Sequence, residues 1–139
     1  MTNSSQDRYR LLIAEDDEGL RETLCQLLTP FMEVVAAESG DEAIAIVERQ
    51  PVHLALFDMH MPNLTGLEAL QIVRAESIVI PCNLMTADWT ADLEAAAEQA
   101  QAYCVLRKPV GRRALMKTMA GAVESAYADS AFRERLLAN

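Results

Sequence analysis

The sequence is poor in several features that would assign it to a class at once. Its 139 residues include only three cysteines, which are widely separated and form no C-x-x-C pair. An odd number of scattered thiols argues against a disulfide framework or a zinc site, and favours buried, free cysteines in a reducing cytoplasm. No run of about 18 apolar residues is present, so no membrane-spanning helix is predicted. The polar stretch from Met1 to Gln6 lacks the apolar core of a signal peptide.

Positive charge is also scarce. Twelve Lys and Arg residues face 21 Asp and Glu residues, which gives a net charge of −9. This balance disfavours non-specific binding to nucleic acids or to anionic membranes, both of which require a basic surface. We therefore expect neither direct nucleic-acid binding nor membrane insertion. A hydrophobic fraction of 51% at this length fits one globular domain with its own core.

Short apolar runs alternate with helix-like patterns along the chain. The five predicted strands are residues 11–14, 33–37, 52–57, 78–85 and 103–106. Each run is continuous rather than alternating, and each is followed by apolar residues at helical spacing. Strands that are apolar on both faces are typical of a parallel sheet with helices on both sides. The sequence therefore predicts an α/β fold of the (βα)₅ type.

Helix starts and domain limits can also be placed. Capping boxes at Ser39–Glu42 and Thr65–Glu68 predict two helix starts, because each hydroxyl can accept from the backbone while the Glu reaches back. We expect a disordered or extended N-terminus over 1–8, one folded domain over 9–128, and a helical extension or frayed tail over 129–139.

Polar residues follow four of the five predicted strands. Glu15 and Asp16 follow the first strand, Asp58 the third, Thr86 the fourth and Lys108 the fifth. In such sheets ligands bind beyond the carboxyl ends of the strands, where the strand order reverses. Converging carboxylates are costly unless a cation is bound or a pKa rises, and Mg²⁺ suits this oxygen-rich set. A lysine and a hydroxyl beside them would complete a phosphoryl site.

Taken singly, each of these residues has a simpler explanation. The acidic run at 15–18 could be a helix N-terminus favoured by the helix dipole, and Thr86 could be a helix cap. His53 and His60 are too far apart to suggest a metal site, and His53 is expected to be structural. Trp89 and Tyr103 are expected to be packing residues.

Five of the basic residues cluster after the last predicted strand. They are Arg107, Lys108, Arg112, Arg113 and Lys117. The cluster could be the solvated start of a helix or a docking patch for an acidic partner, and the sequence leaves both open.

Together these motifs resemble the response-regulator receiver family over about residues 9–128. Residues 11–18 are similar to the first strand and acidic pocket of that family, and 56–62 with Gly66 to its phosphorylation segment. Residues 84–87 and 107–109 are similar to its hydroxyl switch and its lysine. The resemblance implies a flavodoxin-like three-layer sandwich with the parallel strand order 2-1-3-4-5, as in chemotaxis-regulator-like single-domain proteins.

The resemblance also implies roles for the site residues. Asp58 would be the phosphoacceptor, and Mg²⁺ would be bound by Asp16, Asp58 and the backbone carbonyl of His60, with Glu15 acting through a water molecule. Lys108 would pair with a phosphoryl oxygen, and the Lys108–Pro109 peptide bond would be cis.

In the same scheme Thr86 would close on the phosphoryl group. The donor would be a sensor histidine kinase or a histidine phosphotransfer protein, and the output would be phosphorylation-dependent binding to an unknown protein target. The chain would not be an enzyme in the usual sense, since it would catalyse only its own phosphorylation and slow dephosphorylation.

Three features, involving four residues, depart from the family pattern. Val105 stands where an aromatic residue is usual, Gln101 and Tyr103 stand where Gly and Asp are frequent, and Gly111 stands at a position where a capping side chain is common. Val105 is stiff and small, so we expect a conformational signal that is smaller there, or that is carried by Tyr103 or by helix movement instead. Phosphorylation would then alter partner binding mainly through residues 86–90 and local charge.

Two other functions are less consistent with the motifs. An aspartyl phosphatase of the haloacid-dehalogenase group would carry a second Asp where His60 stands. A degenerate, unphosphorylated receiver would not need the full set of acidic, hydroxyl and lysine residues. We expect the domain to stand alone, although the sequence could be a piece of a longer protein.

Overall fold

A computed structural model describes residues 8–138, so the predicted N-terminal segment lies outside the described residues except for Arg8. At its centre is a five-stranded parallel sheet with the order β2-β1-β3-β4-β5. The strands are β1 (Arg10–Ala14), β2 (Glu33–Ala37), β3 (Leu54–Asp58), β4 (Cys82–Thr86) and β5 (Cys104–Arg107). The predicted flavodoxin-like fold and strand order are confirmed.

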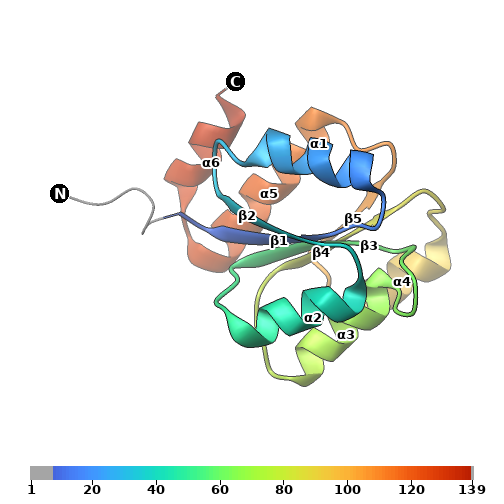
Figure 1. Cartoon of the computed structure of the whole chain (residues 1–139). Coiled ribbons are helices and arrows are strands. Elements are labelled where there is room, and N and C mark those ends of the chain that lie inside the picture. The colour runs from blue at the N-terminus through green and yellow to red at the C-terminus, as the bar shows by residue number, and fades with distance from the viewer. Residues whose placement is uncertain (1–7, 139) are drawn as a thin grey trace.

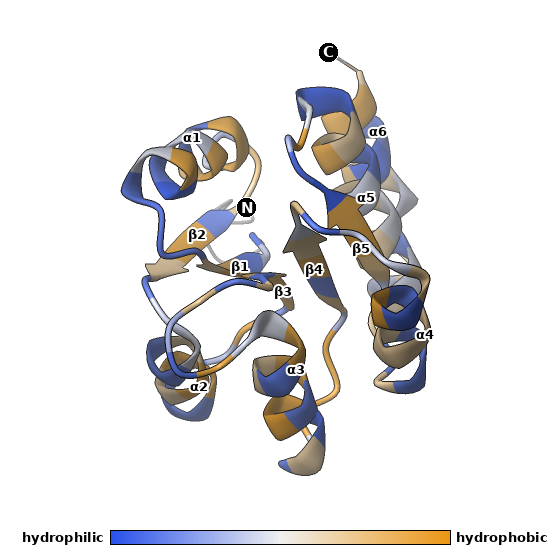
Figure 2. Cartoon of the chain, turned by 90° about the vertical axis from the view of Figure 1, so that its right-hand side faces the viewer, coloured by the Kyte–Doolittle hydropathy of each residue, from blue (hydrophilic) through white to orange (hydrophobic). Residues whose placement is uncertain are grey.

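Helices cover both faces of the sheet (Figure 1). On one face lie α1 (Glu18–Leu28), α5 (Arg112–Tyr127) and α6 (Ser130–Leu137). On the other lie α2 (Gly40–Arg49), α3 (Gly66–Ala75) and α4 (Ala91–Gln99). The helices carry both hydrophobic and hydrophilic stretches (Figure 2), as expected when one side packs on a sheet and the other faces solvent.

The central position of β1 explains where the site forms. Its Ile13 is in register with Ala36 of β2 on one side and with Leu56 of β3 on the other. Every residue of β3 and β4 is buried, because these strands are covered on both faces. The chain segments that leave β1 and β3 therefore emerge side by side at one edge of the sheet.

The fourth strand differs from the prediction. Ile78, Val79 and Ile80 lie outside the sheet, and β4 begins at Cys82, just after Pro81. Pro81 has no N–H to donate to a sheet, and Val79 is 90% exposed. The Arg74 guanidinium instead donates to the Ile80 carbonyl at 2.8 Å, which holds this apolar run as a connection.

One of the two predicted capping boxes is complete. In the first turn of α3 the Thr65 hydroxyl accepts from the Glu68 N–H at 3.1 Å, and the Glu68 carboxylate accepts from the Thr65 N–H at 2.8 Å. At α2 the Ser39 hydroxyl accepts from the Glu42 N–H as predicted, but the Glu42 carboxylate accepts from the N–H of Glu38 instead.

Helix α6 joins the core on the α1 and α5 side. Its Phe132 is 0% exposed and its Leu136 is also buried. The Asp129 carboxylate caps the helix by accepting from the Phe132 N–H at 3.0 Å, and it also accepts from the Tyr9 hydroxyl at 2.6 Å. Tyr9 thereby ties the start of β1 to this last helix.

An aromatic cluster surrounds this contact at the amino end of the sheet. The ring of Tyr9 stacks on Tyr127 and meets Phe132 and His53 edge to face. His53 Nδ1 accepts from the Arg10 N–H at 2.9 Å, and burial together with the nearby Arg10 charge lowers the pKa of His53. The expected structural role of His53 is therefore confirmed.

The cysteines are free, but they are not all buried as predicted. Cys82 lies in the core, whereas Cys25 and Cys104 are half-buried on the other face of the sheet. Among the described residues, no helix is both long enough and apolar enough to span a bilayer.

Candidate functional site

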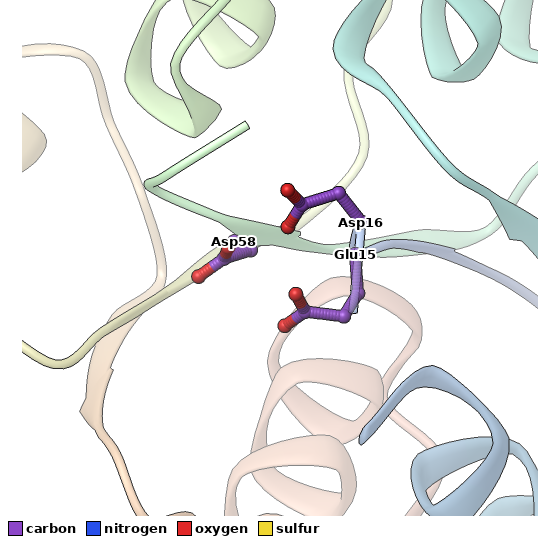
Figure 3. A group of neighbouring side chains, drawn as sticks. All are labelled: Glu15, Asp16 and Asp58. Atoms are coloured by element: carbon purple, nitrogen blue, oxygen red, sulfur yellow. The ribbon is translucent and has the colours of Figure 1, made fainter. Parts of the chain in front are cut away.

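Three carboxylates converge at the carboxyl end of the sheet. Glu15 and Asp16 directly follow β1, and Asp58 is the last residue of β3. The pairing of Ala14 with Phe57 brings these strand ends to the same level. One oxygen from each carboxylate lies within 4.8 Å of the others, and Figure 3 shows the three side chains at neighbouring strand ends.

The three acids differ in exposure. Glu15 and Asp58 are each 1% exposed, whereas Asp16 is exposed to solvent. Backbone contacts fix Glu15, because its N–H donates to the Ala37 carbonyl at 3.1 Å and its own carbonyl accepts from the Arg21 guanidinium at 2.8 Å. Its second carboxylate oxygen accepts from the Asp17 N–H. Arg21 is a supporting residue that no sequence motif indicated.

Lys108 enters the site from the opposite side. Its Nζ lies 2.9 Å from Glu15 Oε1 and 2.8 Å from Asp58 Oδ1. The Lys108 N–H donates to the Thr86 carbonyl, which extends the β4–β5 pairing by one residue beyond β5. The Lys108–Pro109 bond is cis, as the family resemblance implied.

The pocket carries more negative than positive charge. Burial raises the pKa of Glu15, and the nearby Asp58 carboxylate raises it further, while Lys108 and the Asp17 N–H act in the opposite direction. Burial alone would lower the pKa of Lys108, but its contacts with Asp58 and Glu15 outweigh this and raise it. The negative charge of Asp58 raises the pKa of Glu15, and that of both acids raises the pKa of Lys108, and the same negative charge favours binding of a cation.

Thr86 ends β4 on the same rim. It is buried, and its Oγ1 accepts from the Asp88 N–H at 3.0 Å. Thr86 is therefore not the cap of α4, a role taken by Thr90, whose hydroxyl accepts from the Leu93 N–H. Because a hydroxyl has one proton of its own, Thr86 keeps a donor for a further ligand.

Glycine at position 66 allows α3 to begin directly against the β3 terminus. A Cβ on Gly66 would lie 2.5 Å from the Asp58 carbonyl oxygen, which is closer than such atoms approach. The Gly66 N–H also donates to the Met59 carbonyl at 3.3 Å. A side chain at residue 66 would therefore displace the backbone that carries Asp58.

The loop between β4 and α4 has contacts that the sequence did not reveal. Trp89 lies beneath the guanidinium of Arg107, whose Cζ is 4.0 Å from the ring centroid. His60 Nε2 lies 3.4 Å from the Asp88 carboxylate, on the exposed side of the loop. The prediction that Trp89 is a packing residue is therefore incomplete, because its half-buried ring stacks on the Arg107 cation.

Val105 occupies the family's usual aromatic position. It pairs with Leu84 in β4 and packs half-buried against the core on the α2, α3 and α4 side. Tyr103, two residues earlier, is 43% exposed, and its hydroxyl lies against Gly121 of α5. Tyr103 is therefore more exposed than the packing role expected for it.

The donor set suits Mg²⁺. Among residues 8–138, Glu15, Asp16 and Asp58 form a cluster of carboxylate oxygens without His or Cys, as a hard cation prefers. Asp58 Oδ1 is buried and lies 2.8 Å from Lys108 Nζ, so this oxygen already faces a cationic group. His60 follows in the next loop, and a role for its carbonyl stays a prediction.

The chain is similar to curated regulatory proteins. The chain is 34% identical over 112 residues to the response regulator protein FleR of Pseudomonas aeruginosa, covering 80% of this chain and 24% of the relative. It is 29% identical over 130 residues to the transcriptional regulatory protein GlrR of Escherichia coli, covering 91% and 29%. The chain therefore spans about a quarter of the length of these curated relatives.

Solved structures show the same architecture. A CheY-like response regulator receiver domain protein from Methanospirillum hungatei superposes with a TM-score of 0.80 at 25% identity, covering 85% of this chain and 95% of the other. The signal receiver domain of an HD domain-containing protein from Pseudomonas fluorescens shares the fold, with a TM-score of 0.82 at 23% identity and coverage of 88% and 99%. The family model of the response regulator receiver domain matches residues 11–120, and this chain belongs to that family.

Proposed function

We propose that this receiver domain accepts a phosphoryl group on Asp58 in a Mg²⁺-dependent reaction. The observation that carries the proposal is the contact of Lys108 Nζ with both Asp58 and Glu15, at 2.8 and 2.9 Å, beside a cluster of three carboxylates. A carboxylate that faces a fixed ammonium and cation ligands can act as acceptor for a phosphoryl group, whose negative charge those groups neutralise.

The proposed step transfers one phosphoryl group. An oxygen of the Asp58 carboxylate attacks phosphorus, a P–O bond forms, and the P–N bond to the donor histidine breaks. The bonding electrons stay with the imidazole, which takes a proton and leaves neutral. Asp58 becomes an acyl phosphate, and later attack by water on that phosphate returns the carboxylate and inorganic phosphate.

The chain's own residues divide the work. Lys108 would neutralise one phosphoryl oxygen, and Asp16, Asp58 and the His60 carbonyl would hold the metal, with Glu15 acting through water. When bound, Mg²⁺ supplies positive charge to the remaining phosphoryl oxygens. The Thr86 hydroxyl donates to a phosphoryl oxygen, because its other contact uses only a lone pair.

We propose that phosphorylation of Asp58 changes the conformation of the β4–α4 loop. Thr86 and Trp89 lie in one short segment, so a hydrogen bond from Thr86 to the phosphoryl group would disturb the stacking of Trp89 on Arg107. Val105 is too small and stiff to carry the aromatic movement usual in the family. We therefore propose that residues 86–90 present the signal to a protein target.

The partners follow from the same chemistry. The phosphoryl donor is proposed to be a histidine of a sensor kinase or of a phosphotransfer protein, as for two-component response regulators generally. We also propose a cytoplasmic location, because the three cysteines are free thiols that suit a reducing compartment.

Intact-mass spectrometry after treatment with acetyl phosphate and Mg²⁺ tests the proposal. We expect one added phosphoryl group in the wild type, no addition in Asp58→Asn, and none when EDTA replaces Mg²⁺. Asp41→Asn, an exposed acid in the first turn of α2, serves as the matched control and should be phosphorylated normally. A mass gain that persists in Asp58→Asn would place the modification on another residue.

A further inference from the structure

A groove lies between the first half of α5 and the end of α6, apart from the carboxylate site. It has a volume of about 650 Å³, within the range of pockets that bind ligands. Six residues line it: Arg112, Arg113, Met116, Lys117, Leu136 and Leu137. Met116 and Leu136 are buried and form an apolar floor, while Leu137 is 40% exposed at its edge.

The charge of the groove is opposite to that of the protein. Three of its six lining residues are cationic and none is acidic, although the chain carries a net charge of −9. Arg113 and Lys117 are exposed, and neither makes an ion pair with any residue of the described part of the chain. The groove is thus a local basic surface on an acidic protein.

Helix stability does not account for these cations. Each helix from α1 to α4 has an acidic residue in its first turn, where the positive end of the helix dipole favours it. Helix α5 instead begins with Arg112 and Arg113 after Gly111, which provides no side-chain cap. Arg113 and Lys117 are four residues apart, a spacing at which like charges repel. An acidic ligand would relieve both unfavourable interactions.

We propose that this groove is the docking site for an acidic, amphipathic helix of a partner protein. An apolar side chain of that helix would lie over Met116 and Leu136 beside Leu137, and its carboxylates would face Arg113 and Lys117. Helix-in-groove binding uses this combination of an apolar anchor and charged flanks. The apolar floor and the negative charge of the protein as a whole favour an acidic protein segment over nucleic acid. The inference goes beyond phosphoryl transfer and does not depend on it.

Fluorescence anisotropy on the unphosphorylated protein tests the proposal. The probe is a rhodamine-labelled synthetic helix with leucines along one face and glutamates on the other. A second probe replaces every glutamate with glutamine. The key variant is Lys117→Glu, and its matched control is Arg49→Glu, which makes the same charge change at an exposed site on α2, across the sheet.

We expect saturable binding of the acidic probe to the wild type and to Arg49→Glu. Binding should weaken at least tenfold in Lys117→Glu, more than threefold in Leu137→Ser, and with rising salt as the charges are screened. The glutamine probe should bind at least tenfold more weakly than the acidic one. Circular dichroism should show that both exposed-site variants stay folded.

Several results would overturn the proposal. One is the absence of saturable binding, and another is an equal loss in Lys117→Glu and Arg49→Glu, which would show a response to net charge alone. Binding of duplex DNA with the same dependence on Lys117 would identify a nucleic-acid surface instead. A concentration-dependent dimer that is lost in Lys117→Glu would identify a second copy of this chain as the occupant.

Discussion

The two ends of the sheet differ in the polar groups that they carry and in how those groups are paired. At the carboxyl end, three carboxylates lie close together, and the Lys108 ammonium contacts two of them, Glu15 and Asp58. At the amino end, the Tyr9 hydroxyl donates to Asp129 and the Tyr127 hydroxyl donates to the His53 carbonyl. The carboxyl end gathers negative charge, whereas at the amino end tyrosine hydroxyls hydrogen-bond around stacked rings.

This difference separates binding from stability. Functional sites commonly hold charges in arrangements that destabilise the fold until a ligand binds. Here the amino end, with α6 and its aromatic contacts, supplies stability that can offset the repulsion at the other end. Changes at the two ends should therefore have separable effects, which the following predictions test.

The largest expected effect comes from Phe132→Ala at the amino end. This side chain is fully buried in α6, so its removal should lower the free energy of unfolding by about 3–5 kcal/mol. The thermal midpoint should fall by about 10 °C or more. Calorimetry measures this, with Leu137→Ala as the control at a partly exposed position. A loss of Mg²⁺ affinity in the folded variant would show that the ends are coupled after all.

At the carboxyl end, Asp16→Asn should weaken Mg²⁺ binding by about 100-fold or more, equivalent to about 2.7 kcal/mol. Glu15→Gln should cost only about tenfold, because its proposed contact runs through a water molecule. Titration calorimetry compares the two neutralised acids directly. Equal affinities in these variants would remove the distinction between a direct ligand and an indirect one.

Glu15→Gln should stabilise the protein when Mg²⁺ is absent. The folded-state pKa of Glu15 lies above its unfolded value, so the associated stability is present at low pH and is lost as pH rises through the folded pKa. Glu15→Gln cannot ionise, so it should not lose this stability, and at pH 7 it should unfold at a higher temperature than the wild type. With Mg²⁺ at 100 times its dissociation constant, the free energy of unfolding of the wild type rises by about 2.7 kcal/mol. The difference in stability between the variant and the wild type should then shrink or change sign. A wild type that, in the absence of Mg²⁺, is more stable than Glu15→Gln would contradict this prediction.

Tyr9→Phe should cost about 1 kcal/mol, because it removes the 2.6 Å hydrogen bond to Asp129. Burial and this bond raise the pKa of Tyr9 from 10.0 to about 12. The stability that the Tyr9 hydroxyl contributes is therefore complete below pH 10.0 and is lost as the pH rises through about 12. The same bond lowers the pKa of Asp129, whose contribution is lost in acid as that carboxylate takes up its proton. Urea unfolding at several pH values should show the two proteins converging at both extremes.

The smallest expected effect concerns Arg107→Ala. An exposed cation–π contact contributes about 0.5–1 kcal/mol, so stability should change little. The emission of Trp89, the only tryptophan, should shift because its ring loses the guanidinium above it. Arg113→Ala is the matched control and should leave the emission unchanged. Beryllofluoride should shift wild-type emission in the same direction if the loop carries the signal, and a large rearrangement at Val105 instead would contradict that.

The convergence of the site could be predicted because it depends on strand ends alone. The four residues Glu15, Asp16, Asp58 and Lys108 each lie at or just after the end of a strand, and parallel strand ends meet on one side of the sheet. The stacking of Trp89 on Arg107 could not be predicted in this way, because it depends on how two separate segments and their side-chain rotamers fit together.

Two features of the fold could be predicted only in part, for local reasons. Residues 78–80 are as apolar as a strand, but Pro81 and the contacts of Arg74 hold them outside the sheet. Helix α6 has only two buried residues, Phe132 and Leu136, so its sequence shows little periodicity. Its place is set instead by Tyr9, a residue 120 positions before its partner Asp129.

That contact also orders events during synthesis. Tyr9 leads into β1, the strand that pairs with both β2 and β3, yet its hydrogen-bond partner is 120 residues later in the chain. A chain emerging from the ribosome can pair β1 with its neighbours long before α6 is available, since domains fold as their segments appear. The docking of α6 is therefore a late folding step. It brings together segments that are 120 residues apart, near the first and last described residues of the domain.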